Sequence, residues 1–258
     1  MRKVDAEKIE TGLAAAQAKQ AANSVMINKE MLPSLGKFYD GDLYARKLNA
    51  IEIKNLSKVN QNNISAVFNK IVGDCIEGVE LYDILLNDKI WFIYYLRSLT
   101  FDDAPYKVKC QCPVCDTTSV QDFTLDKLIV KHPKKDLPEF IELPNGDKIT
   151  PRYPTIGDEV QINRLKNDPN VIEAIDDEIM TICAHIKEIN GKKMTLWDAY
   201  SYFAVNGCRG SGKDFAYFIK AMKDYIFSCD MLFKTECGCG EEIISPIPLV
   251  PAFFVPEV

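Results

Sequence analysis

Five of the nine cysteines in this 258-residue chain fall into two tight clusters. Cys110, Cys112 and Cys115 stand in mid-chain, and Cys237 and Cys239 stand near the carboxyl end. Two thiolates separated by two residues can turn back onto one ion, and Zn²⁺ takes four such ligands in a tetrahedron at about 2.3 Å. We therefore predict a zinc site whose ligands are Cys112, Cys115, Cys237 and Cys239. Cys110 is the alternate ligand, because residues i and i+2 of a strand share one face.

All four predicted ligands are thiolates, and this decides the role expected of the site. A shell closed by protein ligands leaves no position for water or substrate, so the zinc would be structural. Residues 116 to 236 separate the two clusters, so the ion would join the middle of the chain to its C-terminal part. Free thiols and an iron–sulfur cluster are the alternatives, and the lack of a longer cysteine run disfavours the latter. The other cysteines stand among apolar neighbours and are expected to be small core residues: Cys75, Cys183, Cys208 and Cys229.

The composition is that of a globular protein, with 47% apolar and 26% charged residues and a net charge of -6. This acidic balance argues against a surface that coats nucleic acid or an anionic membrane. Apolar runs such as residues 90–96 are much shorter than the ~20 residues of a membrane-spanning helix. The first residues contain no apolar stretch typical of a secretory signal. We expect a protein used in a cytoplasm, where clustered cysteines are more often metal ligands than disulfides.

Hydrophobic spacing and turn signals predict hairpins that interleave with helices. Period-two alternation or a central turn predicts strands or hairpins at residues 37–54, 106–123, 141–153, 185–196 and 231–249. Apolar residues at helical spacing predict helices at residues 57–74, 80–99, 155–166, 169–186, 195–205 and 213–227, with Ser57 as the N-cap of the first. Since the order shows no βαβ regularity, we predict an α+β fold. A zinc-ribbon-like cysteine site would join its mid-chain and C-terminal hairpins.

These elements divide the chain into four expected parts. Residues 1–30 are alanine-rich and form a helical or flexible N-terminal arm. Residues 31–105 form an N-terminal hairpin plus helices. Residues 106–124 and 229–250 together form the zinc-ribbon-like element, and residues 139–228 form further hairpins plus helices.

One stretch resembles a catalytic motif. Residues 207–214 match the phosphate-binding pattern G-x-x-x-x-G-K, but Asp214 stands where a Ser or Thr hydroxyl would meet Mg²⁺. The preceding residues indicate a helix and not the buried strand that the motif needs. We predict a helix–helix loop with Asp214 in the first turn of the next helix. His132 and His185 have no cysteine or serine partner in a recognisable motif, so no histidine-dependent nucleophile is expected.

Several separated stretches together resemble a known family. The first is an LPS-x-G-x-x-Y element (Leu32, Pro33, Ser34, Gly36 and Tyr39), and the second is a helix with an Asp-rich start and a late arginine (Asp88, Trp91 and Arg97). The third is Tyr106 with the CPVC knuckle (Cys112 and Cys115), and the fourth is an L-P-x-G element (Leu143, Pro144 and Gly146). Over roughly residues 32 to 250 the chain is similar to the baseplate proteins of T-even-type contractile-tailed bacteriophages, which help to build the tail baseplate hub. It departs from a plain four-cysteine knuckle by the extra Cys110 and by the C-x-C spacing of the second pair.

The resemblance implies a non-enzymatic structural or assembly protein of a phage tail baseplate, with structural Zn²⁺. Its partners would be other baseplate hub or wedge proteins, with no nucleic acid, membrane span or small-molecule substrate. It would be found in the virion baseplate, or in the host cytoplasm during assembly. The alternative is a zinc-ribbon nucleic-acid-binding or transcription-associated module, which would need a basic face with stacking aromatics. An NTPase that uses the loop at Gly207 is a third hypothesis.

Overall fold

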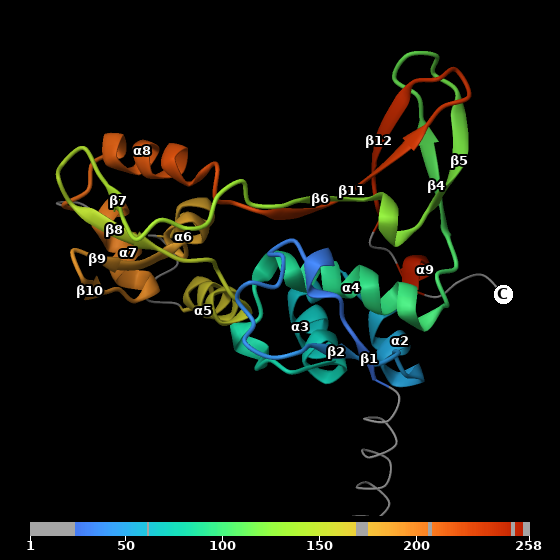
Figure 1. Cartoon of the computed structure of the whole chain (residues 1–258), viewed down its shortest axis with the longest axis horizontal. Coiled ribbons are helices and arrows are strands. Elements are labelled where there is room, and N and C mark those ends of the chain that lie inside the picture. Colours follow the sequence, from blue (N-terminus) through green and yellow to red (C-terminus); the bar gives the residue numbers. More distant parts are fainter. Residues whose placement is uncertain (1–23, 61, 169–174, 206–207, 249–250, 255–258) are drawn as a thin grey trace, which may run out of the picture.

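The computed structural model describes residues 24–60, 62–168, 175–205, 208–248 and 251–254. Short helices and small antiparallel sheets alternate along the chain, which confirms the α+β prediction. Figure 1 shows a central body, a distal lobe on the left and an upright finger on the right. A long two-stranded ribbon runs between the distal lobe and the finger, above the central body. Among the described residues no helix has the length and apolar character needed to cross a membrane.

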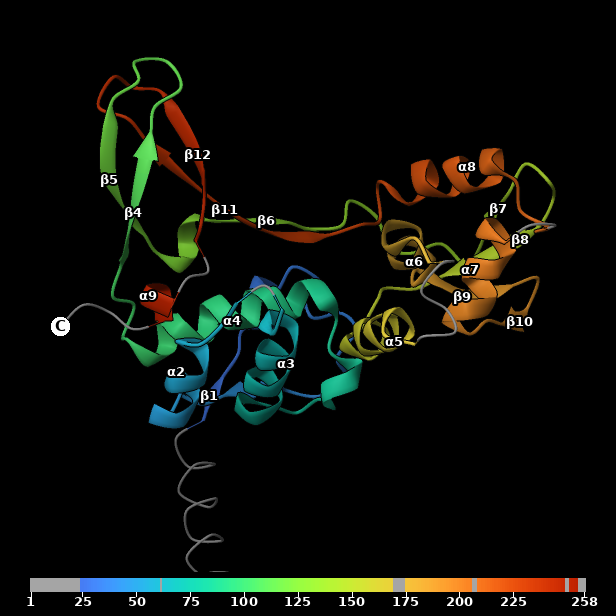
Figure 2. The same ribbon diagram turned by 180° about the vertical axis from the view of Figure 1, so that it is seen from behind.

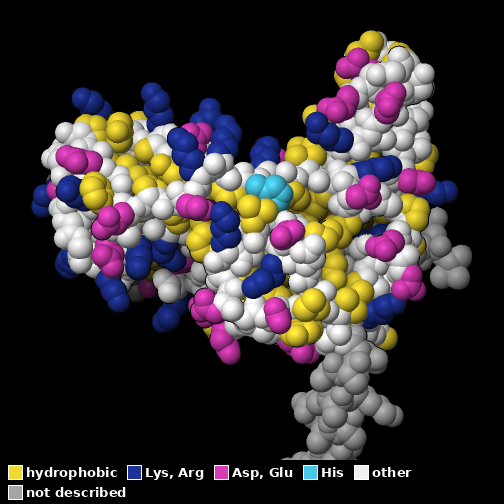
Figure 3. Space-filling model, in the orientation of Figure 1, with side chains coloured by type: hydrophobic (Ala, Val, Ile, Leu, Met, Phe, Trp, Pro, Cys, Tyr) yellow, Lys and Arg dark blue, Asp and Glu magenta, His cyan; other side chains and the backbone are white. Residues whose placement is uncertain are grey.

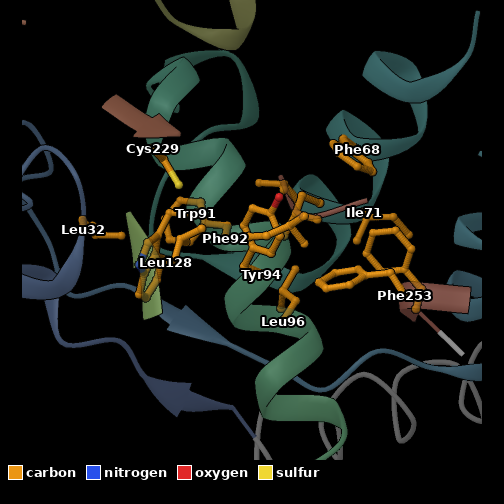
Figure 4. Close-up of a cluster of buried hydrophobic side chains, with 14 of the residues drawn as sticks. Leu32, Phe68, Ile71, Trp91, Phe92, Tyr94, Leu96, Leu128, Cys229 and Phe253 are labelled. Carbon is orange, nitrogen blue, oxygen red and sulfur yellow. The ribbon is translucent and has the colours of Figure 1, made fainter. Parts of the chain in front are cut away.

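The central body holds the main hydrophobic core. It consists of the sheet β1 (Val25–Met26), β2 (Tyr44–Ala45) and β3 (Ile76–Glu77), the 3-10 helices η1 (Lys29–Met31) and η2 (Leu81–Asp83), and the helices α2 (Ala50–Leu56), α3 (Ile64–Cys75) and α4 (Leu86–Thr100). Helix α4 is buried on most of its surface, and its aromatic side chains lie at the centre of the core (Figure 4). Phe253 of the short helix α9 (Pro251–Phe254) packs edge-on against Tyr94, so the C-terminal part of the chain completes this core.

Two predictions for the central body are wrong. Residues 50–54, which were expected to belong to a strand or hairpin over 37–54, form most of helix α2. The cause is a capping box in which the Asn49 side chain accepts from the Glu52 N–H while Glu52 accepts from the Asn49 N–H. Ser57, predicted as an N-cap, ends helix α2, and the next helix begins only at Ile64.

The distal lobe has its own core under a four-stranded sheet. Its strands are β7 (Ile141–Glu142), β8 (Lys148–Pro151), β9 (Ile186–Ile189) and β10 (Lys192–Lys193), in the order β10-β9-β8-β7. The helices are α5 (Ile156–Lys166), α6 (Asp177–Cys183), α7 (Leu196–Ala204) and α8 (Gly212–Met222). Both hairpins predicted here are present, and residues 169–174 of the helix predicted at 169–186 lie outside the described residues.

The finger is built from two hairpins far apart in sequence. Strands β4 (Tyr106–Gln111) and β5 (Thr118–Phe123) form one, and β11 (Ser228–Glu236) and β12 (Glu242–Pro246) form the other. After the 3-10 helix η3 (Leu125–Lys127), strand β6 (Leu128–Lys131) pairs with the first half of β11 to form the ribbon. Figure 2 shows from behind that the hairpins rise side by side from the end of the central body. Of the predicted N-terminal arm, residues 1–23 lie outside the described part of the chain, while Val25–Met26 form strand β1.

Candidate metal centre

The tip of the finger brings four cysteine sulfurs together. The Sγ atoms of Cys112, Cys115, Cys237 and Cys239 all lie within 4.8 Å of one another. The Sγ atoms of Cys115 and Cys237 are 3.6 Å apart, and those of Cys112 and Cys239 are 3.8 Å apart. A tetrahedron with metal–sulfur bonds of about 2.3 Å has edges of about 3.8 Å. The four thiols therefore fit a tetrahedral ion and could hold one.

Each hairpin supplies two of these sulfurs from the turn between its strands. In the β4–β5 turn, the Cys112 N–H donates to the Thr117 carbonyl at 3.0 Å, and Asp116 takes a left-handed φ of 55°. In the β11–β12 turn, the Cys237 N–H donates to the Glu241 carbonyl at 2.8 Å. Gly240 has a φ of 87° there, a conformation that glycine adopts without the steric cost of a Cβ. Both turns thus fold back and aim their sulfurs at one point.

The remaining cysteines lie apart from this cluster. Cys110 shares the buried face of β4 with Val108, whose carbonyl is 3.7 Å from the Cys110 Sγ, and it is not in the four-sulfur group. Cys75, Cys183 and Cys229 are buried, as expected. Cys208 is exposed, contrary to the prediction, because it lies in the loop between α7 and α8.

Hydrogen bonds and neighbouring thiols shift the pKa values of two cysteines of the cluster. Hydrogen bonds with the side chain and the N–H of Thr117 lower the pKa of Cys115 to about 6. A hydrogen bond from the Glu241 N–H also lowers the pKa of Cys239, but the neighbouring Cys237 and Cys115 raise it to about 12. Four sulfurs this close cannot all ionise unless a cation compensates their charge. Without a cation, some of the four thiols would therefore keep their protons.

Few other polar contacts join the two hairpins. They belong to different sheets, so no ladder of backbone hydrogen bonds connects β4–β5 to β11–β12 in the described chain. The Thr235 hydroxyl donates to the Gln121 side-chain oxygen at 2.8 Å, and the Gln121 amide nitrogen is 3.5 Å from the Glu236 carbonyl. The cysteine cluster therefore adds a link between the hairpins at the tip of the finger. Buried apolar side chains also join the hairpins: Phe123 packs edge-on against Phe233 with ring centroids 5.5 Å apart, and Cys112 and Cys237 belong to the same hydrophobic cluster.

The motif that resembles a phosphate loop lies in a different context. Helix α7 precedes it, where nucleotide binding would need a buried strand. Residues 206–207 lie outside the described residues, but Ser211 caps α8, and Asp214 in the first turn accepts from the Ser211 N–H and hydroxyl. This confirms the predicted place of Asp214.

The histidines have structural contacts. His132 Nδ1 is 3.1 Å from the Pro33 carbonyl. His185 follows α6, and burial lowers its pKa to about 4. Neither residue lies in the cysteine cluster.

The LPS-x-G-x-x-Y element is organised around a buried carboxylate. The Ser34 N–H and hydroxyl donate to Asp88 at 3.0 and 2.5 Å, and the Tyr39 hydroxyl donates to the same carboxylate at 2.8 Å. Asp88 itself is fully buried in the first turn of α4. At the other end of that helix, Arg97 Nε donates to the Phe253 carbonyl at 2.7 Å. Four of the residues that carry the resemblance, Ser34, Tyr39, Asp88 and Arg97, thus connect segments that are distant in sequence.

The described residues thus form an α+β protein with a four-cysteine finger. Residues 27–255, most of the chain, match the family described as T4 bacteriophage base plate protein. The chain belongs to this phage baseplate family, as the resemblance predicted. No curated protein and no solved structure matches it.

Proposed function

We propose that this protein is a non-enzymatic structural or assembly subunit of the phage tail baseplate hub, with one structural Zn²⁺ in its finger. Family membership over residues 27–255 supports the baseplate role and association with other baseplate proteins. Other hub or wedge proteins would be the partners, in the virion baseplate or in the host cytoplasm during assembly.

The observation that carries the zinc proposal is the convergence of four sulfurs from two hairpins. Cys112, Cys115, Cys237 and Cys239 would be the ligands, and Cys110 would not be one, because it lies outside the group of four sulfurs that approach one another within 4.8 Å. An ion held by four thiolates has a closed shell, so it would supply structure and no reactive position. Apparent binding free energies of structural zinc are about 10–16 kcal/mol, comparable with the stability of a whole domain.

Replacing a ligand tests this proposal. In Cys115→Ser and Cys237→Ser proteins we expect zinc content to fall from one per chain to well below one half, and limited proteolysis to cut within 106–123 or 232–246. Cys208→Ser is the matched control, because Cys208 is exposed and lies outside the cluster. If both ligand variants keep their zinc and their protease resistance, the structural role is wrong.

Complementation of a phage that lacks the gene tests the baseplate role. We expect the parent and the Cys208→Ser protein to restore complete tails and to purify with the baseplate. Zinc-free variants should leave tails unassembled. A salt-sensitive gel shift with the purified protein would instead favour the nucleic-acid-binding alternative.

A further inference from the structure

The distal lobe has a free sheet edge. Strand β7 is the last strand in the order β10-β9-β8-β7 and pairs only with β8. Glu142 lies opposite Lys148. The Lys148 N–H donates to the Asn190 side-chain oxygen and the Lys148 carbonyl accepts from the Asn190 N–H, each at 2.8 Å, so both groups of Lys148 point toward β9. In an antiparallel pair, residues that face each other in this way do not exchange hydrogen bonds. The N–H and carbonyl of Glu142 therefore point away from the sheet, and no described residue outside the sheet bonds either group.

A groove of about 580 Å³ lies along this edge, between β7 and helix α8. Its lining includes Pro138, Ile141 and Ala221. Phe140, next to β7, and Tyr217, on α8, also line it and are 41% and 46% exposed, so both offer apolar surface to an occupant of the groove. Figure 3 shows hydrophobic side chains gathered on this lobe, at the left of the view, with lysine or arginine side chains around them.

The charges of the groove favour an acidic occupant. The carboxylate of Asp224 is already engaged by Lys135 at 3.3 Å. Lys220 has no carboxylate within 4.0 Å among the described residues, and Lys148 lies over the Phe140 ring at 4.4 Å. Glu142 is the other acidic residue that lines the groove. A carboxylate of an occupant of the groove could therefore form an ion pair with Lys220 on α8.

We propose that this groove takes an extended segment of another baseplate protein, which adds a strand to the free edge of β7. The segment would place an apolar side chain between Phe140 and Tyr217 and a carboxylate beside Lys220. An extended segment fits better than a helix, because only a strand can bond the outward N–H and carbonyl of Glu142. This proposal rests on the proposed baseplate function, which supplies the kind of partner.

Photo-crosslinking in assembled baseplates provides the first test. Tyr217 is replaced by a benzophenone analogue of phenylalanine, and Trp197, exposed on α7 outside the groove, receives the same group as the matched control. We expect position 217 to capture one segment of a different baseplate protein, with acidic and apolar residues at alternate positions, and position 197 not to capture it. Capture of a second copy of this chain, of residues 1–23 or of nothing would overturn the proposal.

A peptide of the captured segment provides the second test, with binding measured by fluorescence anisotropy on the full chain. Proline at 142 removes an N–H that does not bond β8, so Glu142→Pro should fold with an unchanged circular dichroism spectrum. We expect it to bind the peptide at least tenfold more weakly, whereas Glu142→Ala should stay within twofold and Lys220→Ala should lose several-fold affinity. Equal binding by the proline and alanine variants would overturn the added strand.

The two proposals fail in different ways. If the chain is absent from purified baseplates, the proposed function is wrong, and the groove proposal is wrong with it. If the chain is present but position 217 captures no partner segment, only the groove proposal is wrong.

Discussion

The Ser34 hydroxyl lies 2.5 Å from a carboxylate oxygen of Asp88, and both residues are fully buried. This contact ties the loop after η1 to the first turn of α4. We predict that Ser34→Ala lowers the free energy of unfolding by about 1.5–3 kcal/mol, because a buried carboxylate loses a donor. Urea denaturation measures this loss of stability. The control is Ser57→Ala, at the half-buried end of helix α2, which should change the free energy of unfolding by under about 1 kcal/mol. Equal effects of the two substitutions would contradict the role given to Asp88.

Asp88 should also make stability depend on pH. Burial raises its pKa from 3.8 to about 6, although Ser34 and Tyr39 donate to it. Between these values the folded state holds a proton that the unfolded state has released. The contribution of Asp88 to the free energy of unfolding is therefore fully present below about pH 4. It falls by about 3 kcal/mol as the pH rises to about 6.

His185 acts in the opposite direction over the same range. Burial lowers its pKa from 6.5 to about 4, so its contribution is present above pH 6.5 and lost as the pH falls. We predict that Asp88→Asn makes the free energy of unfolding rise more steeply between pH 4 and 6 than in the parent. Urea denaturation at several pH values measures both slopes, and parallel curves would show that Asp88 titrates normally.

A buried ion pair joins the central body to the distal lobe. The Lys89 ammonium on α4 is 2.7 Å from the Glu159 carboxylate on α5, and the Lys89 side chain is only 3% exposed. We predict that Glu159→Ala costs about 3 kcal/mol, because it leaves a buried cation unpaired. Asp74→Ala, which breaks the exposed pair with Lys70, should cost under about 0.5 kcal/mol.

A double substitution tests the cause of that loss. Lys89→Met together with Glu159→Leu removes both charges and should recover most of the stability lost in Glu159→Ala. If the double variant is as unstable as the single one in urea denaturation, lost packing and not the unpaired charge is responsible.

Local sequence signals predict the features that local interactions create. The Asn190-Gly191 turn, the β4–β5 hairpin and the helix that begins after Ser211 all follow from residues within a few positions of one another. The same reasoning fails at residues 50–54, where an alternating pattern suggests a strand but the Asn49–Glu52 capping box starts a helix.

Long-range pairings could not be predicted in this way. Strand β6 lies where the sequence patterns predict no helix or strand, and it is a strand because β11, about 100 residues later, pairs with it. The buried partners of Asp88 are likewise 49 and 54 positions away. The cysteine cluster is the exception, because thiol spacing alone predicts that its four sulfurs would meet.

Zinc K-edge X-ray absorption on the purified full chain tests the central claim most directly. We predict one zinc per chain, with four sulfur neighbours at about 2.3 Å and no nitrogen or oxygen in the first shell. That result would mean that both hairpin turns hold the same ion. A protein without zinc, or a zinc with two or three sulfurs and light-atom neighbours, would contradict it.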